Sequence, residues 1–304
     1  MKRYYDVIGF SILVGAKGLS FPAFEAGLTA FPVLLLAALR FDLAAVILFA
    51  YIFLRGMQSR PETSGDYIAI LAGGLMIFTL STGFWSIGQD LTTSTLSGLM
   101  SSLVPIATAG FSWLLLPEDR LSQGGIFGLT VGFVGALLIV LPGSALEFGP
   151  NTIGKLLIFL GVIGSALGAV IIRWAQPTIP APTQTAWAFA IGAILLHVGS
   201  VGLENPIKDS EVTAVGIFAV LFLGIVVSAL GRGMFFWLIG HRSAIEISIS
   251  SYLAPVIAAV TGWLIFDEEL TALMLGGFVI VLVGFSIMKR QGLRQEVYRL
   301  KSTV

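Results

Sequence analysis

Two stretches of the chain repeat one design about 150 residues apart. Residues 97–135 and residues 247–285 each contain an apolar run with a central proline, an acidic turn and a second apolar run. Pro105 matches Pro255 at an offset of 150 positions, and Gly128 matches Gly277 at an offset of 149, because the second turn is one residue shorter. An internal repeat of this length decides the architecture before other signals do, so we expect two related units.

The composition restricts the environment of these units. The chain has 304 residues, of which 56% are hydrophobic and only 11% are charged, whereas roughly 25% of the residues of a soluble domain are charged. We therefore expect a membrane-embedded protein. The net charge of zero and the lack of a basic run give no reason to expect a nucleic-acid partner. With no cysteine and two separate histidines, we expect no disulfide, metal site or cofactor.

Apolar runs of the length needed to cross a bilayer, about 20 residues, recur along the whole chain. We predict an all-α polytopic membrane protein with ten transmembrane helices, at 7–24, 31–54, 67–87, 93–116, 123–142, 153–173, 183–203, 213–236, 244–266 and 271–288. We interpret the first run as a retained span and not as a signal peptide, because its removal would leave the first unit one span short. Ser122 and Thr271 stand where the N-caps of the fifth and tenth spans are expected.

The basic residues predict the orientation. With the N-terminus inside, only Lys155 and Lys208 lie outside. The inside loops and ends then carry Lys2, Arg3, Arg55, Arg60, Arg120, Arg173, Arg242, Lys289, Arg290, Arg294, Arg299 and Lys301. This bias follows the positive-inside rule and predicts an inner-membrane protein with both termini in the cytoplasm.

The ten predicted spans divide into residues 1–150 and residues 151–288, followed by a basic tail, 289–304. Because five is an odd number, the second unit enters the membrane from the opposite side to the first. The two repeats are therefore predicted to be inverted, an arrangement found in secondary transporters with a substrate site near the midplane.

The repeated motifs resemble a known family. The segments SSLVP…PEDRLS…G…G and SSYLAP…DEELT…G…G, with LAALRF in the second span, are similar to the drug/metabolite transporter superfamily, EamA-type permeases. The resemblance covers nearly the whole chain. It implies a ten-helix permease, most often an exporter of amino acids or related metabolites.

Ionisable residues within spans are costly and are candidates for function. Lys17 lies about ten residues into the first span, roughly 15 Å deep at the helical rise, and Arg40 is similarly placed in the second. Each is predicted to reach a cavity or a buried ion pair. Asp42, two residues from Arg40, points to the other side of its helix. Arg232 is explained about as well by snorkelling as by function. For Glu246 the favoured explanation is stabilisation by the dipole of its helix, with a coupling role as the alternative.

Other candidates are uncharged. Pro105 and Pro255 each remove a backbone donor in mid-span, and the carbonyls that they free belong to Ser101 and Ser251, so we predict kinks that line a cavity or act as hinges. Trp85 and Tyr252 are further candidates for a cavity wall, with packing as the alternative. The predicted substrate-binding set is Lys17, Arg40, Asp42, Trp85 and Tyr252.

These features predict a secondary transporter that works by alternating access and exports small metabolites such as hydrophobic or aromatic amino acids. In this hypothesis Asp42 meets the ammonium group, and Lys17 or Arg40 meets the carboxylate. The alternatives are a multidrug or lipophilic-cation exporter, and then a nucleotide-sugar or sugar-phosphate carrier. An intramembrane enzyme is disfavoured because no catalytic motif is present, and a channel because the chain lacks repeated charged rings. The expected partners are a small-molecule substrate and the lipid bilayer, with the chain acting as a monomer.

Overall fold

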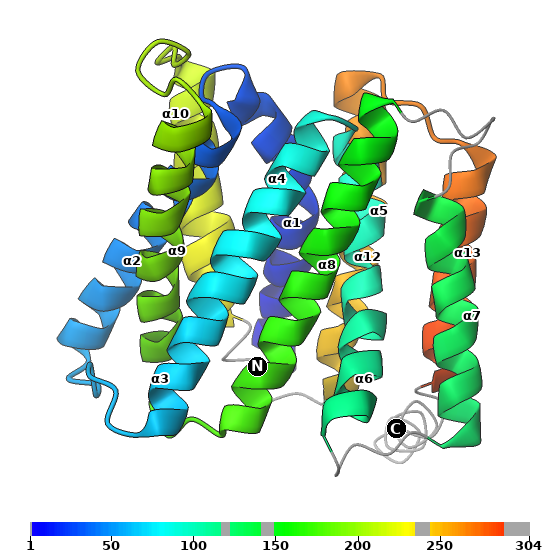
Figure 1. The fold of residues 1–304 in the computed structure, drawn as a ribbon, viewed down its shortest axis with the longest axis horizontal. Coiled ribbons are helices and arrows are strands. Elements are labelled where there is room, and N and C mark those ends of the chain that lie inside the picture. Colours follow the sequence, from blue (N-terminus) through cyan, green and yellow to red (C-terminus); the bar gives the residue numbers. More distant parts are fainter. Residues whose placement is uncertain (1, 117–121, 141–148, 235–243, 289–304) are drawn as a thin grey trace.

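The computed structural model describes residues 2–116, 122–140, 149–234 and 244–288, and every regular element in these ranges is a helix (Figure 1). The elements are α1 (Lys2–Leu28), α2 (Val33–Leu54), α3 (Ser64–Leu71), η1 (Ala72–Ser81), α4 (Thr82–Asp90), α5 (Ser94–Ser101), α6 (Leu103–Leu115), α7 (Gln123–Val140), α8 (Pro150–Ala175), α9 (Ala181–Leu203), α10 (Ala214–Leu221), η2 (Phe222–Leu230), α12 (Ala244–Phe266) and α13 (Ala272–Met288). Each apolar segment predicted from the sequence overlaps a helix or a run of consecutive helices. The all-α class is therefore confirmed.

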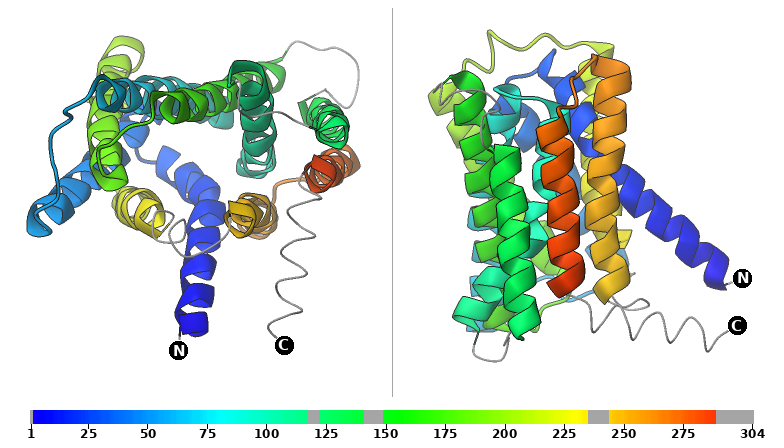
Figure 2. Two further views of the ribbon diagram at one scale, coloured as in Figure 1. Left: turned by 90° about the horizontal axis from the view of Figure 1, so that it is seen from below. Right: turned by 90° about the vertical axis from the view of Figure 1, so that its right-hand side faces the viewer.

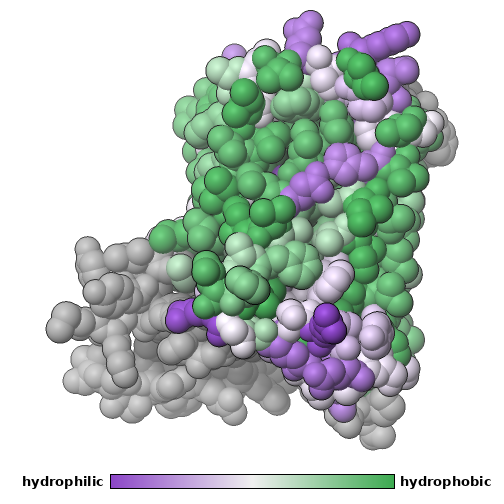
Figure 3. Space-filling view, turned by 90° about the vertical axis from the view of Figure 1, so that its left-hand side faces the viewer, coloured by the Kyte–Doolittle hydropathy of each residue, from purple (hydrophilic) through white to green (hydrophobic). Residues whose placement is uncertain are grey.

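The helices have the length and surface of a membrane protein. Among the described residues, six helical stretches are long and apolar enough to cross a bilayer, namely Val33–Leu54, Ser64–Asp90, Ser94–Leu115, Pro150–Ala175, Ala181–Leu203 and Ala214–Met234. Shorter apolar helices occur at Gln123–Ile139, Tyr252–Phe266 and Ala272–Met288. Large apolar side chains such as Phe53 and Phe218 are exposed, and Figure 3 shows a broad hydrophobic band between hydrophilic ends. A surface of this kind is stable in lipid and not in water.

The helices of the two halves are interleaved in space. α7 and α13 stand as a pair at one edge of the molecule in Figure 1, and α2 packs on α9 near the opposite edge. α1 packs against α12, α10 and η2. Figure 2 shows that α1 begins outside the bundle and runs obliquely into it. The first half of the chain therefore packs mainly against the second half.

Hydroxyl caps begin several helices. The Ser122 hydroxyl accepts a hydrogen bond from the Gly125 amide at 3.2 Å, and the Thr271 hydroxyl accepts one from the Met274 amide at 3.2 Å. Both predicted N-caps are therefore confirmed. Such a cap satisfies a donor that the first turn of a helix leaves without an intrahelical partner.

Two further helix starts are capped by carboxylates from distant parts of the chain. Glu204, which ends α9, accepts hydrogen bonds from the Leu34 and Leu35 amides of α2, at 2.8 and 3.3 Å. Glu268 accepts bonds from the Ser94 and Thr95 amides of α5, at 2.9 and 2.7 Å. A negative charge is stabilised at a helix N-terminus, so each contact also fastens one half of the chain to the other.

Glycines permit close packing between α7 and α13. A Cβ added at Gly128 would lie 2.6 Å from the Gly284 carbonyl oxygen, and a Cβ at Gly135 would lie 2.7 Å from that of Gly277. Gly277 is the counterpart of Gly128 in the duplicated sequence, and Gly284 is the counterpart of Gly135. The contact of Gly128 with Gly284 and the contact of Gly135 with Gly277 are therefore equivalent, with the two halves exchanged. Such reciprocal contacts between antiparallel helices are expected at an interface with two-fold symmetry.

Equivalent contacts with the two halves exchanged are also found around two π-helical stretches. η1 and η2 occupy equivalent places in the two halves, and their glycines Gly74 and Gly224 are 150 positions apart. A Cβ at Gly74 would meet Ile191 of α9 at 2.7 Å, and a Cβ at Gly224 would meet Leu43 of α2 at 2.8 Å. π-helical turns are rare and often occur at functional sites. Both stretches contribute to the cavity described below.

The two repeated prolines differ in their effect on the helix. The helical run that contains Pro105 is interrupted at Ser102, between α5 and α6, and the Ser101 hydroxyl donates to the Gly98 carbonyl at 2.6 Å. α12 continues through Pro255 without interruption. The matched kinks predicted from the sequence are therefore found as one interrupted helix and one continuous helix.

Candidate functional site

A cavity of about 300 Å³ lies where the two halves meet. Its wall is built by α1, α2, η1 and α4 from the first half and by α8, α9, η2 and the helical turn after η2 from the second. The lining residues are Leu13, Lys17, Ser20, Phe21, Phe24, Arg40, Phe41, Ile77, Phe78, Ser81, Thr82, Trp85, Ser86, Gln89, Ser165, Phe189, Val227, Ser228, Gly231 and Arg232. The volume is at the lower end of the range for small-molecule sites.

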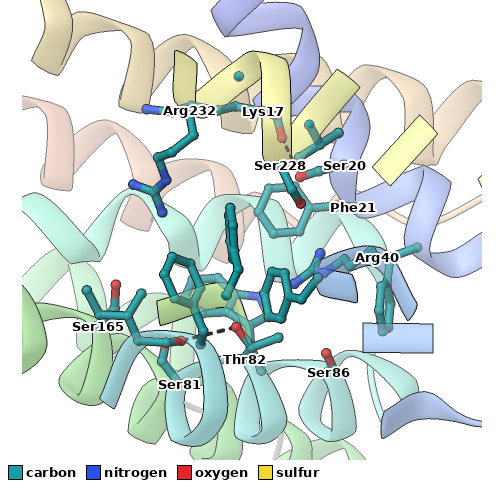
Figure 4. Close-up of a pocket in the computed structure, with 18 of the residues that line it drawn as sticks. Lys17, Ser20, Phe21, Arg40, Ser81, Thr82, Ser86, Ser165, Ser228 and Arg232 are labelled. Carbon is teal, nitrogen blue, oxygen red and sulfur yellow. Dashed lines mark hydrogen bonds between the residues drawn. The ribbon is translucent and has the colours of Figure 1, made fainter. Parts of the chain in front are cut away.

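Three basic side chains contribute to this lining, from separate elements. Lys17 comes from α1, Arg40 from α2 and Arg232 from the turn after η2. In the view of Figure 4, Lys17 and Arg232 extend toward the same side of the pocket, and Arg40 enters from the other side. None of the described residues on the lining carries a carboxylate. The described wall is therefore positively charged.

Aromatic rings connect the two guanidinium groups. The Arg40 guanidinium lies over the Phe41 ring at 4.7 Å, and the Arg232 guanidinium lies over the Phe78 ring at 5.4 Å. The centroids of Phe41 and Phe78 are 5.2 Å apart, and Phe189 contacts both rings, at 5.0 and 4.3 Å. A cation over a ring face is stabilised by the ring quadrupole. The rings thus hold the two cations in place without neutralising them.

Three of the six hydroxyl groups on the described wall donate to the backbone. Ser81 donates to the Gly161 carbonyl at 2.6 Å, Ser20 to the Lys17 carbonyl at 2.6 Å and Thr82 to the Ile77 carbonyl at 3.1 Å. Their oxygens keep lone pairs, but their protons are engaged. The remaining donor capacity of the wall therefore lies with its nitrogen atoms and with the hydroxyl groups of Ser86, Ser165 and Ser228.

Two of these nitrogen donors have no acceptor. Arg40 Nε and Trp85 Nε1 are buried, and neither has a hydrogen-bond partner in the described structure. Both atoms can only donate. Buried polar atoms in native structures are nearly always paired, so an unpaired donor on a cavity wall indicates where a ligand acceptor would bind.

Asp42 does not reach the cavity. Its carboxylate lies 2.7 Å from His197 Nε2 of α9, and both side chains are partly exposed, at 47% and 38%. Val46 and Val201, which follow Asp42 and His197 by four residues on the same faces of α2 and α9, are 66% and 73% exposed. Asp42 therefore belongs to the outer, lipid-facing side of these helices. The structure does not bring it together with Arg40, although only one residue separates them in the chain.

The other sequence-predicted candidates are distributed unevenly. Lys17, Arg40 and Trp85 line the cavity, and their role in binding stays a prediction. Tyr252 packs against Phe285 with ring centroids 4.4 Å apart, away from the cavity lining, and its buried hydroxyl has no partner. Pro105, Pro255 and Ser101 do not line the cavity either. The side chains of Ser251 and Glu246 lie outside the described residues.

The phenylalanines, Gln89 and the second guanidinium, Arg232, were not among the predicted site residues. A signal for some of them exists in the spacing of the chain. Phe21 and Phe24 follow Lys17 at positions i+4 and i+7, and Trp85 and Gln89 follow Ser81 at i+4 and i+8, so each set lies on one helix face. Gln89 donates to the Phe21 carbonyl at 2.9 Å and to Glu25 at 3.2 Å, which joins the two faces.

Apolar helices around a positively lined cavity are typical of a membrane protein that carries a small solute. Comparison with known proteins identifies its family. The sequence profile of the EamA-like transporter family matches residues 7–141 and residues 152–290, and the chain belongs to that family. It is thus a transporter of the drug/metabolite superfamily, as its motifs suggested.

Its relatives include proteins named as transporters. The chain is 28% identical over 292 residues to the uncharacterized transporter YvbV of Bacillus subtilis, and the aligned region covers 94% of this chain and 92% of the relative. It is 25% identical over 259 residues to a chloroplastic WAT1-related protein of Arabidopsis thaliana, covering 83% of this chain and 61% of that longer protein. A solved crystal structure with 20% identity has the same fold, with a TM-score of 0.65 over 95% of this chain and 98% of the other.

Proposed function

We propose that this protein is a secondary transporter that exports a small, carboxylate-bearing metabolite by alternating access, with the cavity as its substrate site. The observation that carries this proposal is the lining of the cavity. Both halves of the chain contribute to it, and it combines three basic side chains with aromatic and hydroxyl groups. A cavity at the interface of repeated halves is where transporters of this general design bind their substrates.

The charges of the wall favour an anionic group on the substrate. Buried positive charge is costly without a counter-charge, and a low-dielectric cavity concentrates the field of its charges. Arg40 forms no ion pair in the described structure, and its contacts are the rings of Phe24 and Phe41. Amino acids, the class expected from the sequence, contain the required carboxylate. Lipophilic cations rank below them because the wall would repel a positive charge.

The exchanged contacts support an inverted arrangement of the two halves. An axis that relates antiparallel helices while exchanging Gly128 with Gly277 and Gly135 with Gly284 must lie across those helices, that is, in the plane of the membrane. Gly74 and Gly224 make their exchanged contacts in the same sense. Ten crossings in two inverted five-helix repeats, spanning 1–150 and 151–288, account for this pattern. Rocking of the halves about the cavity would then give access from either side.

The orientation is supported by the described basic residues. The connection that carries Arg55 and Arg60 lies at the lower end of the molecule in Figure 1, where α8 also ends near Arg173. Lys208 lies in the connection at the opposite end. On the positive-inside rule, the lower end would face the cytoplasm, and the protein would lie in the inner membrane.

Substrate counterflow in proteoliposomes tests the proposal. Liposomes loaded with unlabelled carboxylate metabolites, amino acids included, should take up the same labelled compound transiently and saturably. We expect Lys17→Ala and Arg40→Ala to lower the initial rate about tenfold or more, because each removes a charged contact worth roughly 1.5–3 kcal/mol. Lys208→Ala and Arg60→Ala, at exposed loop positions, serve as matched controls and should keep the wild-type rate.

Two outcomes would contradict the proposal. One is a flux that does not saturate and shows no counterflow, which is the behaviour of a channel. The other is counterflow of lipophilic cations alone, with no response to Lys17→Ala or Arg40→Ala.

A further inference from the structure

The hydrogen-bond donors of the cavity wall restrict the chemical class of the ligand more than the charge of the wall does. Arg40 Nε and Trp85 Nε1 are buried, can only donate and have no acceptor in the described structure. They come from α2 and α4, and both residues line the cavity. A ligand that satisfies them must bring oxygen acceptors, and a carboxylate offers about four lone-pair sites on two oxygens.

The described lining offers an ammonium group no carboxylate. Asp42 is paired with His197 on the outer side of α2 and α9. Glu25 of α1 accepts a hydrogen bond from Gln89 and is not part of the lining. An ammonium group in the cavity would lose its hydration without gaining a negative partner among the described lining residues, which is unfavourable.

The rest of the wall suits an apolar, planar body. Phe21, Phe24, Phe41, Phe78 and Phe189 all line the cavity. Phe21 also lies 6.1 Å from Trp85 between ring centroids, so the Trp85 donor is next to an aromatic surface. Aromatic rings pack favourably on one another in offset or edge-to-face geometry.

We propose that the cavity binds an aromatic organic acid that carries a carboxylate and no ammonium group, in preference to the amino acid with the same skeleton. This inference rests on the proposed function, since it names the substrate class of the same site. Arg40 and Trp85 donate to the carboxylate, and the phenylalanines pack against the body of the acid. Lys17 and Arg232 contribute positive charge at the far side of the pocket.

Three small molecules with one skeleton separate the alternatives. 3-Phenylpropanoate has the ring and the carboxylate, phenylalanine adds the ammonium group, and 2-phenylethylammonium has the ammonium group without the carboxylate. Binding to the purified full-length protein is measured by titration calorimetry. We expect 3-phenylpropanoate to bind about tenfold more tightly than phenylalanine, because a desolvated charge without a partner is unfavourable. We expect no measurable binding of 2-phenylethylammonium.

Matched variants locate the contact. Trp85→Phe keeps a ring and removes the N–H group, and should weaken 3-phenylpropanoate binding by roughly tenfold, the value of a hydrogen bond to a charged group. Trp113→Phe, at a partly exposed site on α6, should leave it unchanged. Arg40→Lys keeps the charge and loses Nε, and should weaken binding, whereas Arg60→Lys should not. Unfolding temperatures establish that each variant is folded.

The results distinguish this inference from the proposed function. Tight binding of 3-phenylpropanoate without counterflow would overturn the transporter proposal and keep the ligand class. If counterflow occurs but phenylalanine binds as tightly as 3-phenylpropanoate or more tightly, the transport function stands and the proposed ligand class is wrong. The ligand class is also wrong if 3-phenylpropanoate does not bind. A phenylalanine preference that disappears in Glu246→Gln would show that Glu246 supplies the missing ammonium partner. Equal effects of Trp85→Phe and Trp113→Phe would overturn the assigned contact.

Discussion

Single carboxylates fasten distant helices at one end of the molecule. Glu204 reaches from the end of α9 to the first turn of α2, and the Ser200 hydroxyl donates to it at 2.6 Å. Glu268 does the same for α5, and the Ser94 hydroxyl donates to it at 2.8 Å. Both lie at the upper end of the molecule in Figure 1, where α9 and α12 end. Glu204 and Glu268 therefore each cap a helix and also connect the two halves of the chain through hydrogen bonds.

Removal of one such cap should destabilise the protein measurably. We expect Glu204→Ala to lower the free energy of unfolding by about 1–2 kcal/mol, the usual value of a lost cap at a helix N-terminus. The measurement is thermal or denaturant unfolding in detergent. Asp209→Ala, an exposed acidic site in the following loop, is the control and should change stability by less than about 0.5 kcal/mol. Equal effects of the two substitutions would show that the cap contributes nothing.

At the scale of helices, the ends of apolar runs and their caps could be predicted from the sequence. Ser122 and Thr271 were placed correctly, because a hydroxyl before an apolar run satisfies a free amide wherever the helix packs. The direction in which a side chain points could not be predicted. Arg40 and Asp42 are equally ionisable, and only the packing of α2 against η2 and α9 turns one inward and the other outward. Nothing in the composition of η1 or η2 indicated a π-helix.

The interrupted helix at Pro105 gives a prediction at this scale. Pro105→Ala restores a backbone donor and should join α5 to α6, so we expect a higher unfolding temperature and a slower counterflow rate per folded molecule. Pro255→Ala should have a smaller effect on rate, because α12 is already continuous. Stability and counterflow are measured on the same preparations. A loss of stability with an unchanged rate per folded molecule would assign both prolines a structural role only.

At the scale of the whole molecule, the duplication predicted the pairing of the two halves, and the exchanged glycine contacts between α7 and α13 agree with it. The position of the cavity followed from the general design of repeated transporters. The charge of the cavity lining depends on residues that differ between the two halves, and the duplication could not predict it. Phe41 stacks on Phe189, 148 positions further along, whereas the position equivalent to Arg40 is Ala188. The scaffold is therefore repeated, but the charge on the cavity wall is not.

The orientation can be tested with single cysteines, because the chain contains none. We expect a membrane-impermeant maleimide to label Asp209→Cys in intact cells and to label Arg60→Cys only after the membrane is opened. Both sites are exposed and lie in connections at opposite ends of the molecule. Labelling of Arg60→Cys alone in intact cells would show that the orientation is the reverse of the predicted one. Labelling of both variants in intact cells would show that the two sites lie on the same side of the membrane.

The hydrogen-bonded pair of Asp42 and His197 also has a consequence for the lipid around the protein. Asp42 lies nine residues into α2, about 13 Å from the start of that helix at the usual rise, which is well inside a hydrocarbon layer of about 30 Å. Acyl chains cannot solvate a carboxylate or an imidazole, so water and headgroups must dip toward this pair. We therefore expect the bilayer next to α2 and α9 to be thinner than a bilayer without protein, with the pair of Asp42 and His197 at the place where it thins.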